Sequence, residues 1–276
     1  MTAETSRGRA GPNLAGADLA GADQTRADLT ASDLTASDLT GTDIGRLVSD
    51  LCERLFAELD DLRGMLVTSL PAEGARRADV AIEARCHQLM READGLVAGA
   101  GWVAARGLLA DAPHWLEWWT PDPGEGSAPK RLAAETDPRA VGFRDYTTLP
   151  WYAVPLETGA RHITGPYVDY VCTDQYTLTF TVPVVREGAF LGVAGADVLV
   201  RSFEERLFAP LGRVAGTCAI VNSAGRVVTA SDPRWVTGDL IRGLPVSQWW
   251  RGEDVAHDRW VFHPCPGLPL GVITAR

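Results

Sequence analysis

The chain has 276 residues, a hydrophobic content of 46% and a formal net charge of −10. This length allows one good core, or two small ones joined by a helix. The negative charge disfavours nucleic acid as a partner, because nucleic-acid-binding surfaces need clustered cations. We see no apolar stretch long enough to cross a membrane and no signal-peptide pattern, so we expect a soluble, cytoplasmic protein.

The first residues, 1–41, are dominated by a run of fives, "AGADLAGADQTRADLTASDLTASDLTGTD", with Asp at every fifth position and usually Leu after it. The run resembles pentapeptide repeats, which stack into a right-handed β-helix. A solenoid coil is stable only against neighbouring coils, and this run is too short for two full coils. The composition instead favours a solvated, acidic, low-complexity tail, which we expect to be disordered.

Residues 42–94 are expected to be helical, with Thr42 or Asp43 as the first N-cap. A second helix is expected over 76–92. The apolar face of the first helix would pack on a core, or would pair with a second copy of the chain in a homodimer. This face is indicated by apolar residues that recur every three or four positions: Ile44, Leu47, Val48, Leu51, Leu55, Leu59, Leu62 and Leu66.

After Gly95 the pattern changes to strands, first in "LVAGAGWVAARGLL" and in "HWLEWWTPD". The glycines of "GAGWVAARG" lack the spacing and the following helix of a dinucleotide fingerprint, so no nucleotide site is expected. A short helix is expected over 145–157. Three strands follow in "HITGPYVDYV", "QYTLTFTVPVV" and "AFLGVAGADVLV", with a tight "REG" turn between the last two.

A helix in "RSFEERLFAPL", with Ser202 as a candidate N-cap, leads to a second group of strands. These are a hairpin in "GTCAIVNSAGRVVTASD" and two strands in "RWVFHPCPGLPLGVITA". Two antiparallel β units in tandem, with helices at their margins, indicate an α+β fold. The five cysteines are scattered and form no CxxC pair, which fits reduced thiols better than disulfides or a zinc site.

Aromatic residues gather in one part of the chain. Trp151 lies among the tyrosines, and a tryptophan-rich strand that includes Trp119 precedes them. A tyrosine offers an electron-rich face and a hydroxyl, which suits a small organic cation. All the tyrosines fall in this span: Tyr146, Tyr152, Tyr167, Tyr170 and Tyr176.

Carboxylates accompany the aromatic residues. An Asp inside a β run is costly unless it is exposed or has a partner, and Asp169 and Asp197 lie on strands expected to be neighbours. Both could converge on one positive group. They could instead serve acid–base catalysis or bind a metal, but no positioned nucleophile and no histidine at metal spacing supports either chemistry. We expect no catalytic residue, metal or cofactor.

The run "PWYAVPLETGARHITGPYVD…YTLTFTVPVVREGAFLGVAGADV" resembles the Cache family of extracytoplasmic ligand sensors, specifically the double-Cache type. The family's typical run is a "WY" dipeptide, "(W/T)xPYxD", "(S/T)xPV" and "GVxGxDI". The resemblance implies a long N-terminal helix followed by two PAS-like antiparallel β-sheet modules. Residues 95–210 would be the ligand-binding Cache module, and residues 211–276 a shortened second Cache-like module.

In the amino-acid-binding branch of the family, an Arg two residues before "WY" holds the ligand carboxylate, and the acidic and tyrosine positions hold the amino group. Leu149 occupies the arginine position here. An apolar side chain cannot balance a buried carboxylate, so we expect an amine or quaternary ammonium ligand unless Arg144 or Arg161 substitutes. The candidate ligand-binding residues are Trp151, Tyr152, Tyr167, Asp169, Asp197, Tyr146, Asp145 and Trp119.

The resemblance implies a sensor rather than an enzyme. Because family members are usually membrane-anchored and this chain shows no span, we expect a stand-alone sensor that signals to a separate partner protein. Three alternatives stay open. They are an α-amino-acid sensor, an enzyme acting on a small amine with Asp169 or Asp197 as general base, and a scaffold that works through its 44–66 helix.

Overall fold

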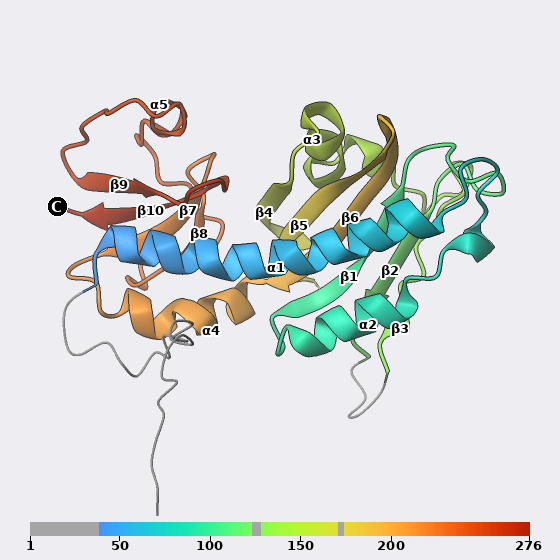
Figure 1. Ribbon diagram of the computed structural model, residues 1–276. Helices are drawn as coiled ribbons and strands as arrows, with labels where there is room; N and C mark the ends of the chain where they lie inside the picture. The colour runs from blue at the N-terminus through green and yellow to red at the C-terminus, as the bar shows by residue number, and fades with distance from the viewer. Residues whose placement is uncertain (1–38, 123–127, 171–173) are drawn as a thin grey trace, which may run out of the picture. The chain divides into compact units, whose positions relative to one another are not determined.

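The computed structural model describes residues 39–122, 128–170 and 174–276 (Figure 1). The repetitive segment expected to be disordered lies outside these ranges except for its last residues. Within the described ranges, no helix combines the length and the hydropathy of a membrane-spanning segment.

The long helix α1 spans Gly41–Ser69 and starts earlier than predicted. Its N-cap is Thr40, whose hydroxyl accepts a hydrogen bond from the backbone N–H of Asp43 at 3.2 Å. The Asp43 carboxylate accepts in return from the backbone N–H of Thr40 at 3.0 Å. The prediction of Thr42 or Asp43 as N-cap was wrong because Asp43 is the second partner of this capping box rather than the cap itself.

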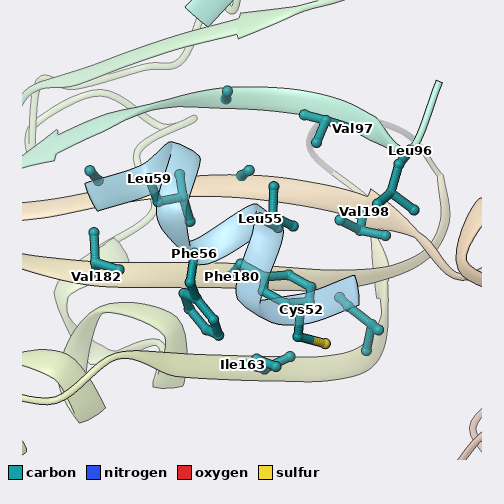
Figure 2. Packing of buried hydrophobic residues seen from close by; sticks show 14 of the residues in the cluster. Cys52, Leu55, Phe56, Leu59, Leu96, Val97, Ile163, Phe180, Val182 and Val198 are labelled. Carbon is teal, nitrogen blue, oxygen red and sulfur yellow. The ribbon is translucent and has the colours of Figure 1, made fainter. Parts of the chain in front are cut away.

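The apolar face of α1 packs against the chain's own β-sheets. Figure 2 shows Leu55, Phe56 and Leu59 over strand residues that include Phe180 and Val198. The same buried cluster extends into the second sheet. This face was predicted either to pack on a core or to pair with a second copy, and the structure uses it for the core. The buried residues of this face belong to the chain's own core, and the homodimer stays a prediction.

The predicted helix over 76–92 is divided. A 3-10 turn η1 spans Arg77–Asp79, and the α-helix α2 spans Glu83–Glu92. The Asp79 carboxylate accepts from the backbone N–H of Arg76 at 2.7 Å, which closes the short turn before α2 begins. The predicted strands follow as β1, Val97–Ala104, and β2, Leu116–Thr120, and a short strand β3, Lys130–Arg131, pairs with β2.

The predicted helix over 145–157 is also divided, into the 3-10 turn η2, Tyr146–Thr148, and α3, Pro150–Thr158. Pro150 disfavours a helical conformation at the preceding residue, and Leu149 is extended with φ −80° and ψ 142°. The strands β4, His162–Asp169, β5, Gln175–Arg186, and β6, Ala189–Leu199, follow as predicted.

The hairpin between β5 and β6 turns at Glu187 and Gly188, which both have positive φ, as a tight two-residue turn requires. Helix α4, Val200–Leu211, begins directly after β6. Ser202 lies inside its first turn and Leu199 is the N-cap, so the prediction of Ser202 as cap was wrong. The strand simply continues into the helix without a capping side chain.

The second group of elements comprises β7, Cys218–Asn222, β8, Val227–Ala230, the short helix α5, Val246–Trp250, β9, Trp260–Pro264, and β10, Leu270–Ala275. All sheet pairings are antiparallel. The first sheet has the order β3-β2-β1-β6-β5-β4 and the second β8-β7-β10-β9. A long helix followed by two antiparallel sheets confirms the predicted α+β fold, while the exact domain boundaries stay a prediction.

The cysteines within the described ranges, Cys52, Cys86, Cys218 and Cys265, are unpaired and buried. Burial raises the pKa of Cys86, Cys218 and Cys265 to about 12, so these thiols stay protonated and weakly reactive.

Shortening single leucine side chains of α1 tests whether its apolar face packs in the core. Leu59 is fully buried, whereas Leu47 on the same helix is 37% exposed. We expect Leu59→Ala to lower the free energy of unfolding by about 2–5 kcal/mol, because it leaves a cavity under the helix. Leu47→Ala is the matched control and should cost under about 1 kcal/mol in urea denaturation. An equally large loss for Leu47→Ala would show that the outer face is buried in an interface.

Candidate ligand-binding site

A cavity of about 670 Å³ lies on the face of the six-stranded sheet that α1 does not cover. Side chains alternate between the two faces of a strand, so each central strand serves both faces. On β5, Leu178 and Phe180 belong to the core beneath α1, while Thr179 between them lines the cavity. On β6, Ala196 and Val198 face the core and Asp197 lines the cavity.

Trp118 of β2 lies across the neighbouring strands on a row of glycines. A Cβ on Gly99 would lie 2.7 Å from its indole nitrogen, one on Gly101 would lie 2.1 Å from the carbonyl oxygen of Glu117, and one on Gly195 would lie 3.1 Å from its ring. Because a larger residue at these positions would displace the indole, the glycines set the depth of the cavity. This is the packing role of the "GAGW" run, which the sequence had only excluded as a nucleotide motif.

A bulge in β4 aims two predicted site residues at the cavity. Ile163 pairs with Phe180 and faces the core, whereas Tyr167 pairs with Thr177 after a one-residue shift in register. Residues four apart in a regular strand share a face, so the extra residue turns Tyr167 away from the side that Ile163 occupies. Gly165 lies in the bulge with φ 128°, and a Cβ there would lie 2.5 Å from the carbonyl oxygen of Thr177.

The base of the cavity is acidic, and we call it the acidic floor: Asp169, Asp197, Tyr167 and Thr179. The Thr179 hydroxyl donates to Asp197 Oδ1 at 2.7 Å, and the Tyr167 hydroxyl lies 2.7 Å from Thr179 Oγ1. Since the single hydroxyl proton of Thr179 is given to Asp197, Tyr167 is the donor in the second bond. Asp197 is 4% exposed and Asp169 is 7% exposed.

Burial raises the pKa of Asp197 from its usual 3.8 to about 7, and the nearby Asp169 raises it further, against the lowering effect of the Thr179 hydrogen bond. The indole N–H of Trp118 also lowers this pKa, although it lies outside hydrogen-bond geometry. No cation among the described residues contributes to this balance. Within the part of the chain that the structure describes, Asp197 therefore has no balancing positive charge, and a cation would be bound favourably beside it.

An aromatic wall adjoins the acidic floor. The rings of Tyr146 and Trp151 stack with centroids 6.3 Å apart and an interplanar angle of 25°, and both line the cavity. The Tyr146 hydroxyl accepts from the backbone N–H of Trp115 at 3.0 Å, which fixes its ring. Electron-rich rings of this kind contact cations favourably.

Three of the predicted residues lie outside the cavity wall. Tyr152 is buried behind it, 5.6 Å from the ring of Phe190. Asp145 caps the exposed turn η2 and accepts from the backbone N–H of Thr147 at 3.0 Å. Trp119 faces the opposite side of the sheet from Trp118, with its ring 5.0 Å from that of His87. The other predicted residues line the cavity: Trp151, Tyr167, Asp169, Asp197 and Tyr146.

The structure also brings in residues that were not among the predicted set. Trp118 and Thr179 line the floor, and residues 132–136 form a further part of the wall. The alternating threonines of "TLTFT" were the available signal for Thr179. Leu149, at the family's arginine position, lines the cavity and is 42% exposed.

Of the two arginines considered as substitutes, only Arg144 lines the cavity, where it is exposed. Arg161 is paired with Glu53 of α1, with one nitrogen-to-oxygen distance of 2.7 Å, and lies 4.5 Å from the ring centroid of Phe56. Arg161 is thus committed elsewhere. An amine without a carboxylate was expected unless one of these arginines substitutes for the family's arginine. Arg144 is placed where it could balance a ligand carboxylate.

Comparison with known families supports the resemblance seen in the sequence. Residues 131–205 match the family described as the first PDC sensor domain of methyl-accepting chemotaxis protein-like proteins. PDC and Cache name the same kind of sensor domain, so the predicted resemblance is confirmed for the segment that carries the acidic floor. Residues 13–45 match pentapeptide repeats, in 8 copies.

Solved structures share the fold across most of the chain. "Methyl-accepting Chemotaxis protein X" is 16% identical with a TM-score of 0.61, covering 84% of this chain and 94% of that one. The ligand-binding domain of the Pseudomonas aeruginosa amino acid chemoreceptor PctC, in complex with GABA, is 19% identical with a TM-score of 0.53, covering 83% and 94%. The ligand-binding domain of the Campylobacter jejuni chemoreceptor Tlp3, in complex with L-norvaline, is 12% identical with a TM-score of 0.55, covering 85% and 88%.

The raised pKa of Asp197 predicts how stability depends on pH. The folded state binds this proton more tightly than the unfolded state, so the stabilising contribution is complete below the usual pKa of 3.8 and is lost as pH rises through about 7. We expect Asp197→Asn to be more stable than the wild type by about 1–4 kcal/mol at alkaline pH.

The difference in unfolding free energy between Asp197→Asn and the wild type should shrink as the pH falls to about 4, where the wild-type carboxyl is itself neutral. Urea denaturation of the ligand-free protein across this range measures it. Asp145→Asn, on the exposed turn, is the control and should not reproduce the pattern. A wild-type advantage at alkaline pH would mean that a positive partner balances Asp197.

Proposed function

We propose that this chain is a sensor protein whose first module binds a small molecule with a positively charged amine. The observation that carries the proposal is the acidic floor, where Asp197 is deeply buried with no compensating cation among the described residues. A buried carboxylate without a positive partner is costly, and an ammonium group would offset that cost. The floor lies within the segment that matches the PDC sensor family.

The aromatic wall supports the same ligand class. Trp151 and Tyr146, whose rings stack on each other, line the same cavity as the acidic floor. A desolvated cation over such a ring gains about 1–2 kcal/mol. Apolar side chains, including Leu116 and Leu132, complete the wall and suit a ligand with a short hydrocarbon body.

An amino acid is the second candidate ligand, favoured by Arg144 in the cavity wall. Its guanidinium could hold a ligand carboxylate in place of the arginine that Leu149 replaces. The similar PctC and Tlp3 domains were solved with GABA and L-norvaline, which are both amino acids. The spacing between amine and carboxylate would then decide which amino acid fits.

A matched set of small compounds separates the two ligand classes by thermal shift. We expect n-butylamine to raise the unfolding temperature and butanoate to have no effect, because only the amine carries positive charge to the acidic floor. At a hundred times its dissociation constant a ligand adds about 2.7 kcal/mol of stability. GABA and norvaline, tested beside them, add a carboxylate at two different spacings.

The variants assign the contacts. Asp169→Asn and Asp197→Asn should each remove the butylamine response, whereas Asp145→Asn, outside the cavity, should keep it. If Arg144→Ala weakens GABA or norvaline and spares butylamine, the ligand is an amino acid. Chemical turnover of any bound compound would favour the enzyme alternative. If no amine-bearing compound raises the unfolding temperature, the proposal is refuted and the scaffold alternative is left.

We further propose that ligand occupancy is transmitted to α1 through the segment that follows α3. Helix α3 carries Trp151 in the cavity wall, and its C-cap Gly159 lies two residues before Arg161. Arg161 binds Glu53 of α1 and lies over Phe56 on the next turn. A ligand that moves Trp151 would therefore move a group that is ion-paired to α1.

Hydrogen exchange tests this coupling, because it reports local opening of α1. Binding of the ligand should change the protection of α1 amides around Glu53 in the wild type. Arg161→Ala should abolish that change and leave cavity binding intact. Arg63→Ala is the control, since Arg63 forms only an exposed ion pair with Asp60 on the same helix. An unaltered response in Arg161→Ala would exclude this route.

The cytoplasmic location, the separate downstream partner and a homodimer were expected from the sequence and stay predictions. The tight packing of the apolar face of α1 means that a partner would contact the outer face of that helix, which carries Asp50 and Arg54.

A further inference from the structure

We infer that in the ligand-free protein the buried carboxyl group of Asp197 holds a proton, and that an ammonium ligand binds by displacing this proton into solvent. The inference deepens the proposed function and rests on it. It makes the sensor respond to the amine and to pH together.

The geometry places both carboxylates on one poorly solvated surface. Asp197 projects from β6 and Asp169 from β4, with β5 between them in the sheet. Both are over nine-tenths buried. Ionisation of Asp197 costs the desolvation of its carboxylate and repulsion from Asp169, and the hydroxyl of Thr179 offsets only part of that cost, so Asp197 retains a proton near neutral pH.

The groups that face Asp197 do not remove this cost. Thr179 of β5 donates one hydrogen bond, and the Trp118 indole of β2 lowers the pKa of Asp197 less than Thr179 does. On β1 the facing position is Gly99, which has no side chain. The remaining charged residues of the cavity wall are Arg144 and Glu135, which are of opposite sign and do not contribute to the pKa of Asp197.

The proton and the ligand compete for the same oxygen atoms. A protonated carboxyl group holds its proton covalently, with a pKa of about 7 for Asp197. When a cation R–NH3+ reaches the floor, its charge favours the ionised form and its N–H groups donate to the carboxylate oxygens. The displaced proton passes to solvent, so the charge of the protein–ligand complex equals that of the protonated empty protein.

This exchange also selects among amines. A primary ammonium has three N–H donors, whereas a quaternary ammonium has none and would leave the buried carboxylate oxygens without hydrogen bonds. We therefore expect primary amines to bind more tightly than their trimethylated forms. The sequence predicted either an amine or a quaternary ammonium ligand, and this preference selects the primary amine.

Isothermal titration calorimetry of the full chain with n-butylamine measures the exchange. The binding enthalpy is measured in two buffers that differ in ionisation enthalpy, and their difference gives the number of protons released. With a pKa of about 7 we expect about 0.9 proton released at pH 6, about half a proton at pH 7 and almost none at pH 9. The apparent affinity should rise about tenfold per pH unit below pH 7 and level off above it.

Two variants sharpen the assignment. Thr179→Val removes a hydrogen bond that lowers the pKa of Asp197, so proton release should persist to higher pH. Asp145→Asn changes a carboxylate outside the cavity and should leave the release unchanged. Butyltrimethylammonium in place of butylamine should bind at least tenfold more weakly, because it cannot donate to the floor.

The outcomes separate this inference from the proposed function. Butylamine binding with no buffer dependence at any pH would refute the proton exchange and keep the amine sensor. If no amine binds, the proposed function fails, and carbon-13 NMR titration of the Asp197 carboxyl in the ligand-free protein still decides where the proton resides. A midpoint near the usual 3.8 would overturn the inference, and a midpoint near 7 would support its first half.

Discussion

The alternation of side chains along β5 and β6 is the constraint on which the rest of this structure depends. One face of these strands is apolar and lies beneath α1, and the other face carries Thr179 and Asp197. A strand can serve two such environments only because successive residues point to opposite sides. The core and the cavity are thus built from the same two strands. A one-residue shift in the register of either strand would exchange the side chains of the two faces and disrupt both.

Burying the acidic floor lowers the stability of the ligand-free protein. Asp197 is desolvated, and the hydroxyl of Thr179, which itself accepts from Tyr167, satisfies only part of the hydrogen-bonding capacity of that carboxylate. Groups that are poorly balanced in the empty protein are characteristic of binding sites, since their cost is recovered when the ligand arrives. The rest of the module provides a rigid frame for them, including the bed of glycines beneath Trp118.

The placement of α1 bears on how such a sensor could signal. The helix contributes to the core beneath the first sheet, and near its start Thr42 hydrogen-bonds His263 of the second sheet at 3.1 Å. It therefore contacts elements of both sheets, while Arg161 ties it to the segment after α3. Movement of either sheet would therefore change contacts that this helix makes.

The sequence by itself determined the α+β fold, the strands and the long amphipathic helix, because hydrophobic periodicity carries that information. Its clustered aromatic and acidic residues, together with the resemblance to the Cache family, also singled out five residues that line the cavity: Trp151, Tyr167, Asp169, Asp197 and Tyr146. Only the tertiary structure decided that Trp119 and Tyr152 lie outside the cavity, that Arg144 rather than Arg161 lines it, and that the apolar face of α1 is buried in its own chain. The physical reason is that such outcomes depend on contacts between distant segments. A single bulge near Gly165 or a proline at the start of α3 redirects side chains without altering the pattern that predicts the strand or the helix.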